Sequence, residues 1–171
     1  MRRLLIGLAV VFGAAGLAVP AALAGSPHFI KSATSVSISQ TGATAGDLTC
    51  SFKEAGLESG STETVTCAAT AKTTYECVNN GGHNPSASNK TTTESKVSAS
   101  GEFTPDKNGN IVGSLTLSPP SAATLGFSCP GGQTVTFVSV IYSVISISDA
   151  DTAQTFSLGD TTLSYTNPNA P

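Results

Sequence analysis

Apolar and polar residues alternate with a period of two in one short segment after another, and this pattern limits the fold more than any other feature. Residues 48–52 and 65–69 are two clear examples. A period of two sends alternate side chains to opposite faces of a β-strand, here an apolar face and a face rich in Ser and Thr. Clusters of Gly, Pro, Asn and Asp separate these segments, and no segment has a convincing helical period. The sequence therefore predicts an all-β fold: an antiparallel β-sandwich, Ig-like or a partly closed barrel, of about 7–9 strands.

Turn-forming residues between the apolar runs suggest which strands pair as hairpins. Residues 105–110 predict one hairpin between the strands on either side of them. A closing hairpin is expected across residues 156–165, with its turn at Gly159. Segments 47–52 and 62–71 are expected to pair with each other around a third turn.

The apolar run at residues 135–147 differs from the others because its phase changes. Its apolar residues stand first at odd positions, then at even positions such as Val140 and Val144, and again at odd positions from Ile145. Such a change is typical of a central strand that is buried on both faces, or of a strand with a β-bulge.

The first 24 residues have the features of a secretion signal. Arg2 and Arg3 precede an uncharged apolar stretch, and Ala22 and Ala24 are the small residues that a signal peptidase reads. We expect cleavage after Ala24 and a protein that is secreted to the extracellular space. An uncleaved membrane anchor is the alternative, but Pro20 and the short apolar stretch disfavour it.

The chain of 171 residues has room for one domain of this class. We expect the signal peptide at residues 1–24 to be removed. A loose N-terminal tail at 25–34, a single β-sandwich domain at 35–166 and a C-terminal tail at 167–171 would then remain.

Four cysteines follow the predicted signal, and an even number in an exported domain predicts two disulfides. Metal binding is the competing interpretation, but no pair has the C-x2-C spacing of a zinc site. Three connectivities are possible. The pairing expected around the third turn places Cys50 opposite Cys67, which leaves Cys77 to bond with Cys129.

Charge and composition exclude two classes of protein. Lys and Arg number 8 against 11 Asp and Glu, and the net charge is -3. A nucleic-acid-binding protein would have a clustered basic face, so we expect no nucleic-acid partner.

Hydrophobic residues make up 39% of the chain, too many for a disordered protein. After signal cleavage we expect no insertion into a membrane.

Two histidines are the first candidates for catalysis. His28 lies near the expected new N-terminus, where chains are usually poorly ordered. A Ser–His–Asp site would need His83 as its base, but no G-x-S-x-G elbow accompanies it. We expect His83 to belong to a surface loop, and we predict no catalytic residue and a protein that is not an enzyme.

Asp149, Asp151 and Asp160 are candidate oxygen ligands for calcium. The glycine and the bidentate glutamate of a calcium loop are missing from this segment. A solvated hairpin tip is the favoured interpretation, so we expect no metal and no cofactor.

Glu54, Glu58 and Glu63 flank a turn and could mimic the paired carboxylates of a glycosidase. A sugar cleft normally has aromatic platforms, whereas this chain has no Trp and three Tyr residues. The sequence therefore disfavours a glycosidase site here.

Two motifs resemble those of a group of small secreted actinobacterial β-proteins. Residues 75–82 are Y-E-C-V-N-N-G-G and residues 129–133 are C-P-G-G-Q, and the similarity extends from Ser32 through Ile147. The group has no assigned activity, so the resemblance carries no catalytic residue to this chain. It implies that the loops at Cys77 and Cys129 are a matched pair, in agreement with the connectivity above.

The two loops tied by this bridge are the expected binding surface. Asn79, Asn80, His83 and Asn84 in one loop and Gln133 in the other offer groups for hydrogen bonds. We expect a binding module for a protein, a glycan or a small molecule outside the cell. The alternatives are a structural or cell-surface interaction protein, a small-ligand carrier, or a secreted enzyme of unfamiliar type. A bridge that only fastens a long loop to the core is the competing interpretation.

Overall fold

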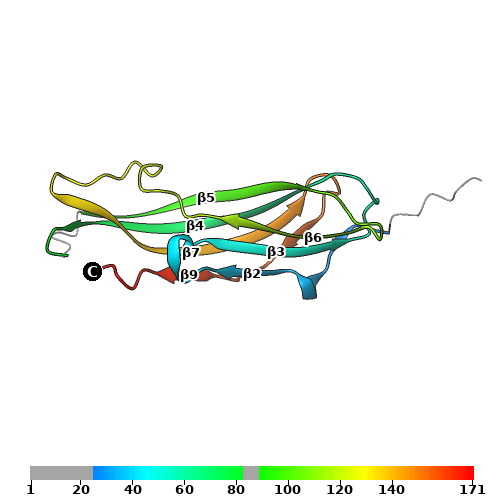
Figure 1. The fold of residues 1–171 in the computed structure, drawn as a ribbon, viewed down its shortest axis with the longest axis horizontal. Coiled ribbons are helices and arrows are strands. Elements are labelled where there is room, and N and C mark those ends of the chain that lie inside the picture. Colours follow the sequence, from blue (N-terminus) through cyan, green and yellow to red (C-terminus); the bar gives the residue numbers. More distant parts are fainter. Residues whose placement is uncertain (1–24, 83–88) are drawn as a thin grey trace, which may run out of the picture.

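The computed structural model describes residues 25–82 and 89–171, which form two antiparallel β-sheets packed face to face (Figure 1). The sheets have four and five strands, which confirms the predicted all-β sandwich. The described strands and the two short 3₁₀ helices are β1 (His28–Phe29), η1 (Lys31–Ala33), β2 (Ser35–Ile38), η2 (Gly42–Thr44), β3 (Leu48–Ala55), β4 (Glu63–Asn79), β5 (Lys90–Phe103), β6 (Asn110–Leu117), β7 (Gln133–Asp149), β8 (Thr155–Ser157) and β9 (Leu163–Thr166).

The smaller sheet is built around β3. Strand β6 pairs with β3 along its whole length, and β1 and β2 occupy successive parts of its other edge. The segment 25–34, expected to be a loose tail, thus contributes β1 and η1 to the fold. Its anchor is Phe29, whose ring packs edge-on against Phe52 with 6.1 Å between the centroids.

The larger sheet has the order β5-β4-β7, and both β8 and β9 pair with the far side of β7. Because β8 and β9 follow each other along β7, they form one interrupted edge strand. The closing hairpin expected across residues 156–165 is therefore wrong. Leu158 continues along β7 and donates its amide to the carbonyl of Ile145 (3.0 Å), so the turn at Gly159 is an excursion within the edge strand.

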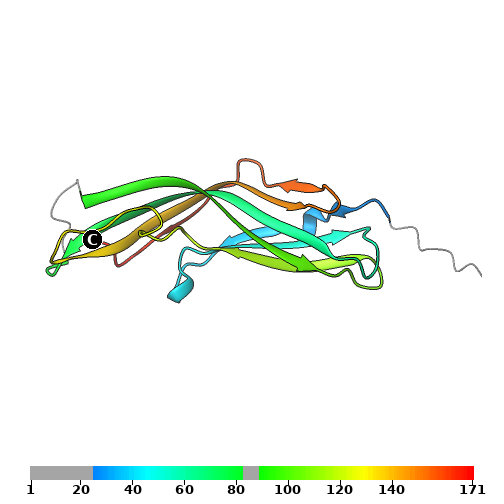
Figure 2. The same ribbon diagram turned by 90° about the horizontal axis from the view of Figure 1, so that it is seen from above.

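The molecule is elongated because three strands of the larger sheet are much longer than those of the smaller one. Strands β4 and β7 have 17 residues each and β5 has 14, whereas β3 and β6 have 8. In Figures 1 and 2 the long strands extend beyond the smaller sheet at one end. The segment 118–132 packs against this extension, where the Tyr75 hydroxyl donates to the carbonyl of Pro120 (2.9 Å).

The core lies between the two sheets and is formed by inward-facing apolar residues at alternate strand positions. Its largest fully buried apolar side chains are those of Leu48, Phe52, Val65, Val140, Tyr142, Ile145 and Ile147. Burying one such aliphatic side chain contributes about 1.5–3 kcal/mol to stability. Rings from both sheets meet in this core, since Phe52 packs edge-on against Phe103 with 5.2 Å between the centroids.

Strand β7 is central in its sheet and has the irregularity that its phase change predicted. Its pairing with β4 shifts register between Ala68 and Thr70, which leaves an extra residue on β7 at Val144. Val144 has a φ of 51°, and 73% of its surface is exposed. The extra residue lets Tyr142 and Ile145 both face the core, three positions apart. The bulge prediction is therefore confirmed.

The predicted disulfides are confirmed, but the hairpin used to derive them is wrong. Cys50 bonds to Cys67 and Cys77 bonds to Cys129. Strands β3 and β4 do not pair, because β3 belongs to the smaller sheet and β4 to the larger one. Each strand turns its apolar face to the core, so the buried Cys50 and Cys67 meet across the sandwich.

The hairpin expected at residues 105–110 is also wrong, although the turn itself forms. Strands β5 and β6 lie in different sheets, so this segment connects the two layers. Asp106 shapes the turn, as its Oδ1 accepts hydrogen bonds from the amides of Asn108 (2.8 Å) and Asn110 (2.9 Å). Gly109 has a φ of 72°, and a Cβ there would collide with the carbonyl oxygen of Leu57.

The two disulfides indicate an oxidising compartment, in agreement with an extracellular location. Within residues 25–82 and 89–171, no helix is long and apolar enough to cross a membrane. The predicted signal peptide, residues 1–24, lies outside the described residues.

Candidate functional site

The disulfide-tied end of the larger sheet contains three of the residues that the sequence singled out for binding: Asn79, Asn80 and Gln133. Asn79 is the last residue of β4 and pairs with Gln133, the first residue of β7. The Gln133 Oε1 accepts a hydrogen bond from the side-chain amide of Asn89 (3.2 Å), while Asn80 is exposed in the turn after β4. The structure therefore brings Asn79 and Gln133 together.

Asn79 also stabilises the turn that follows β4. The Asn79 Oδ1 accepts the amide of Gly81 (2.9 Å), and its carbonyl accepts the amide of Gly82 (2.9 Å), which closes the turn after β4. His83 and Asn84 lie outside the described residues. Asn79 thus has a structural role in this turn, which the sequence interpretation did not include.

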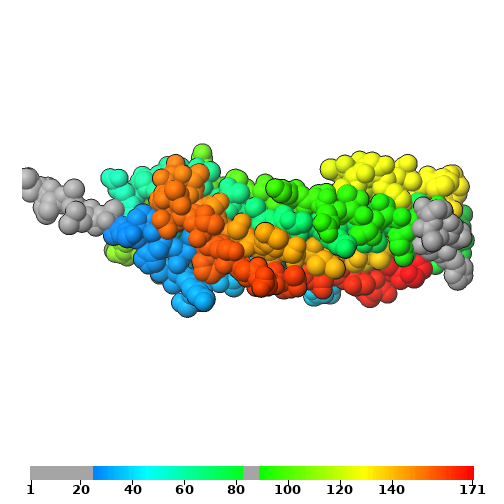
Figure 3. Space-filling model, turned by 180° about the vertical axis from the view of Figure 1, so that it is seen from behind, coloured from blue at the N-terminus to red at the C-terminus, as the bar shows by residue number. Residues whose placement is uncertain are grey.

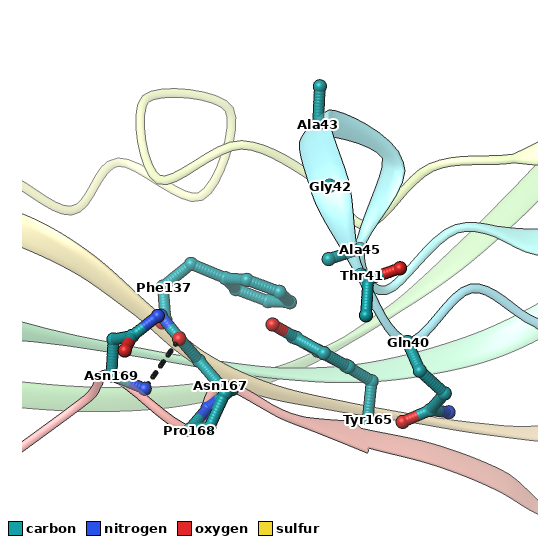
Figure 4. Close-up of a pocket in the computed structure, with 10 residues that line it drawn as sticks. All are labelled: Gln40, Thr41, Gly42, Ala43, Ala45, Phe137, Tyr165, Asn167, Pro168 and Asn169. Atoms are coloured by element: carbon teal, nitrogen blue, oxygen red, sulfur yellow. Dashed lines mark hydrogen bonds between the residues drawn. The ribbon is translucent and has the colours of Figure 1, made fainter.

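A surface cavity of about 450 Å³ lies next to the C-terminal segment, between the turn at η2 and strands β7 and β9 (Figure 4). Its size is within the range of small-ligand sites. No charged side chain is among the ten residues that line it: Gln40, Thr41, Gly42, Ala43, Ala45, Phe137, Tyr165, Asn167, Pro168 and Asn169. The cavity is therefore uncharged and combines aromatic with amide side chains.

A second irregularity of β7 puts an aromatic ring into this cavity. The register with β4 shifts between Thr74 and Tyr75, which leaves Val138 as an extra residue on β7. Phe137 is thereby turned to the inner face, where it meets Tyr75 (5.5 Å between centroids) and stacks on Tyr165 (5.8 Å, planes 15° apart). The three rings come from three strands and form a cluster in which Tyr75 and Tyr165 are buried and Phe137 is partly exposed.

Hydrogen bonds fix the C-terminal wall of the cavity. The side-chain amide of Asn167 donates to the carbonyl of Phe137 (2.8 Å), and its Oδ1 accepts the backbone amide of Asn169 (3.0 Å). The C-terminal tail expected at 167–171 is thus fastened to β7. This wall is preorganised, since its order does not depend on a ligand.

The Tyr165 hydroxyl and the side-chain amide of Asn169 are among the polar groups of the cavity that are left for a ligand. Among the described residues, neither the Tyr165 hydroxyl nor the side-chain amide of Asn169 has a hydrogen-bond partner. In Figure 4 the Tyr165 hydroxyl points toward the middle of the group of lining residues. The Tyr75 hydroxyl, by contrast, donates a hydrogen bond to the carbonyl of Pro120. Burial raises the pKa of this hydroxyl, so it stays neutral.

Three of the acidic residues considered in the sequence gather at the opposite end of the sandwich. Glu63, Asp149 and Asp151 each present a carboxylate oxygen within 4.8 Å of the others, a group that could hold a metal ion. Glu54 adjoins them, and burial followed by the charge of Asp149 raises its pKa to about 7. Asp160, the third calcium candidate, is not part of this group.

Sequence reasoning missed the cavity, because its residues come from segments far apart in the chain. Phe137 falls in the apolar run 135–147 and Tyr165 in the closing hairpin expected across 156–165, and neither was a candidate binding residue. The available signal was the irregular phase of β7, which places Phe137 on the inner face. Gln40 follows β2 and Asn167 follows β9, and both line the cavity only because these two strands lie close together in the fold. No local sequence pattern specifies that arrangement.

Comparison with known proteins gives no match: no protein-family model, no curated protein and no solved structure matches this chain. The function must therefore be argued from the residues and the geometry described above.

Proposed function

We propose that this protein is an exported, non-enzymatic binding module that holds a neutral sugar, as a monosaccharide or one unit of a glycan, in the cavity beside Tyr165. One observation carries the proposal: the cavity is uncharged and joins a stacked aromatic pair, Phe137 and Tyr165, to free polar groups. The absence of charge from its lining favours a neutral ligand over an anion or a cation.

The chemistry of this lining suits a sugar. A sugar ring has an apolar C–H surface, which packs on aromatic side chains, and hydroxyl groups, which both donate and accept hydrogen bonds. The Tyr165 hydroxyl and the Asn169 amide offer a donor and an acceptor each. The volume of about 450 Å³ leaves room for one sugar ring with part of its neighbour.

The fold supports binding without a change of shape. Phe137 and Tyr165 stand on paired strands, and Asn167 ties the C-terminal wall to the Phe137 carbonyl. Groups held in this way lose little conformational entropy when a ligand arrives. Two disulfides and the predicted secretion signal at residues 1–24 support a place of action outside the cell.

Ligand-observed NMR with a panel of soluble neutral oligosaccharides tests the proposal. The parent protein should give saturation transfer to at least one sugar, and Asn169→Ala should lower its affinity about three- to tenfold, as expected for one hydrogen bond. Asn80→Ala is the matched control, since it removes an exposed Asn from the disulfide-tied end. No transfer to any sugar would refute the glycan assignment, and loss of binding in the Asn80 variant alone would move the site to the loops.

A further inference from the structure

Four carboxylates meet at the end of the sandwich farthest from the Cys77–Cys129 bridge. We call Glu54, Glu63, Asp149 and Asp151 the acidic cluster. Glu54 comes from β3, Glu63 begins β4, Asp149 ends β7, and Asp151 lies in the turn that follows. Figure 3 shows this end, where the chain around β8 (orange) lies against the N-terminal segment that includes β1 (blue).

Neutral donors hold the cluster in place. The Thr152 hydroxyl donates to Asp149 Oδ2 (2.9 Å) and to Glu54 Oε1 (3.3 Å), and the backbone amide of Thr64 donates to Asp151 Oδ2 (2.7 Å). The Ser61 hydroxyl donates to Glu63. No member of the cluster is in an ion pair with a cationic side chain of the described residues, in which the two ion pairs are Lys72–Glu94 and Lys90–Glu76.

Glu54 provides an independent indication that a ligand belongs here. Its side chain is completely buried, and its Oε2 has no hydrogen-bond donor among the described residues. The other oxygen of this carboxyl shares the Thr152 hydroxyl with Asp149, so Glu54 is directed at the rest of the cluster. A buried carboxylate oxygen without a partner is costly, and ordinary proteins pair such a group or place it on a metal.

We propose that the acidic cluster binds calcium. Calcium takes oxygen ligands at 2.3–2.6 Å, so two ligands on opposite sides of one ion stand up to about 5 Å apart. The separation of at most 4.8 Å between the oxygens of Glu63, Asp149 and Asp151 fits within this limit. Glu54 is not one of these three ligands, but it lies beside Asp149 with its buried Oε2 unpartnered, and its carboxyl group adjoins the ion site.

This proposal departs from the interpretation of Asp149 and Asp151 as a solvated hairpin tip. It is also independent of the sugar cavity, which lies toward the other end of β4 and β7. An ion bound by these residues would join β4 to β7 and to the turn after it, beside Glu54 of β3 in the smaller sheet. It would therefore fasten the end of the sandwich that lies beyond the Cys50–Cys67 bridge.

Isothermal titration calorimetry of the full exported chain with CaCl₂, after treatment with a chelator, tests the site. The parent should bind one Ca²⁺ per chain with a Kd at or below the range of about 10⁻⁴–10⁻³ M typical of extracellular modules. Asp151→Asn keeps an oxygen that can accept the Thr64 amide, so the turn should still form, and affinity should fall at least tenfold. Asp160→Asn makes the same charge change outside the cluster and should bind Ca²⁺ like the parent.

A second variant separates calcium binding from a purely structural role. Saturating Ca²⁺ should raise the Tm of the parent, because the ion binds only the folded chain. Glu54→Gln removes one negative charge and keeps the shape of the side chain. Its Tm without calcium should equal or exceed that of the parent, and its calcium-dependent Tm shift should be reduced or lost.

Three results would overturn the proposal. The first is no binding heat and no Tm shift at about 10 mM Ca²⁺, well above the range of extracellular sites. The second is an equal loss of affinity in Asp151→Asn and Asp160→Asn, which would indicate nonspecific attraction of cations. The third is binding of Mg²⁺ at least as tight as that of Ca²⁺, which would contradict the calcium assignment.

Discussion

Glu63 and Asn79 are the first and last residues of one continuous strand, β4. At about 3.3 Å per residue, they are separated by roughly 50 Å. The acidic cluster begins at Glu63, the disulfide-tied loops begin at Asn79, and the sugar cavity lies beside the last third of the strand. Substitutions in the two candidate sites are far enough apart for their effects on stability to add independently.

Tyr165→Phe tests the cavity without disturbing the fold. The change keeps the ring that stacks on Phe137 and removes a hydroxyl that has no partner among the described residues. We expect the Tm to stay within about 2 °C and the affinity for the bound sugar to fall about three- to tenfold, the value of one net hydrogen bond. NMR titration and thermal unfolding of the same sample measure both quantities.

Tyr142→Phe is the matched control for this experiment. Its buried hydroxyl donates to the carbonyl of Gly46 (3.0 Å), so its loss leaves a buried acceptor unpaired. Stability should fall by about 1–3 kcal/mol while sugar affinity is unchanged. Unchanged affinity in both tyrosine variants would argue against a role of the Tyr165 hydroxyl in binding.

Val144→Asn should stabilise the protein. Val144 has a φ of 51° at the bulge of β7, a conformation that β-branched residues rarely adopt and that Asn tolerates. Since 73% of its surface is exposed, little apolar burial is lost on substitution. We expect the free energy of unfolding in urea to rise by about 1 kcal/mol.

The same substitution at Val112 should have the opposite sign. Val112 is 78% exposed on β6, where the backbone is extended and Val is a better strand former than Asn. Stability should fall by up to about 1 kcal/mol. A loss of stability of equal size in both variants would mean that the Val144 conformation carries no strain.

The acidic cluster predicts a specific dependence of stability on pH in calcium-free buffer. Glu54 has a pKa of about 7 in the folded protein against an ordinary value of 4.5. The folded state therefore holds this proton more tightly than the unfolded chain. The resulting stabilisation is complete below about pH 4.5 and is lost as the pH rises through about 7.

Urea denaturation of the parent and of Glu54→Gln at several pH values between about 5 and 8 measures this contribution, which the pKa of Glu54 places in that window. The difference between the two proteins isolates Glu54 from other titrating groups. Parent stability should fall more steeply with pH than that of the variant. Equal slopes would show that Glu54 titrates as it does in the unfolded chain.

Removal of the Cys77–Cys129 bridge should destabilise the protein more than removal of Cys50–Cys67, because the longer loop restricts the unfolded chain more. The bridges span 52 and 17 residues, for which the loop-closure model gives about 4 and about 3 kcal/mol. Hydrogen exchange should locate the effects differently. Replacing Cys77 and Cys129 with Ala should lower protection in residues 118–132 first, whereas replacing the core pair should lower it in both sheets. Identical protection patterns would contradict this assignment.

Local patterns predicted the strands, the disulfides and the bulge, but not which strands pair. Alternation identifies the buried face of each strand, and Cys50 and Cys67 both lie on such a face. The pattern does not say whether the next strand pairs with this one in the same sheet or lies across from it in the opposite sheet, so it cannot choose between the two arrangements. The connection after β3 crosses to the other layer, and the disulfide forms in either arrangement.

The sequence contains one sign of the acidic cluster, at Glu54. Glu54 has the parity of Leu48, Cys50 and Phe52, and it is buried like them. An acidic residue at an inward position near a strand end therefore marks a group that needs a partner. That Asp149 provides the neighbouring carboxylate depends on how β7 and β3 face each other, which is a property of the tertiary structure.

The length of β4 has a mechanical consequence. Hydrogen bonds between antiparallel strands run perpendicular to the strand direction. Both neighbours of β4 pair with it over most of its length, so tension along the long axis loads these bonds in shear. Bonds loaded in this way share the force and must yield together, whereas bonds pulled across the sheet would open one after another. The molecule is thus most resistant to force along the axis that joins its two candidate sites.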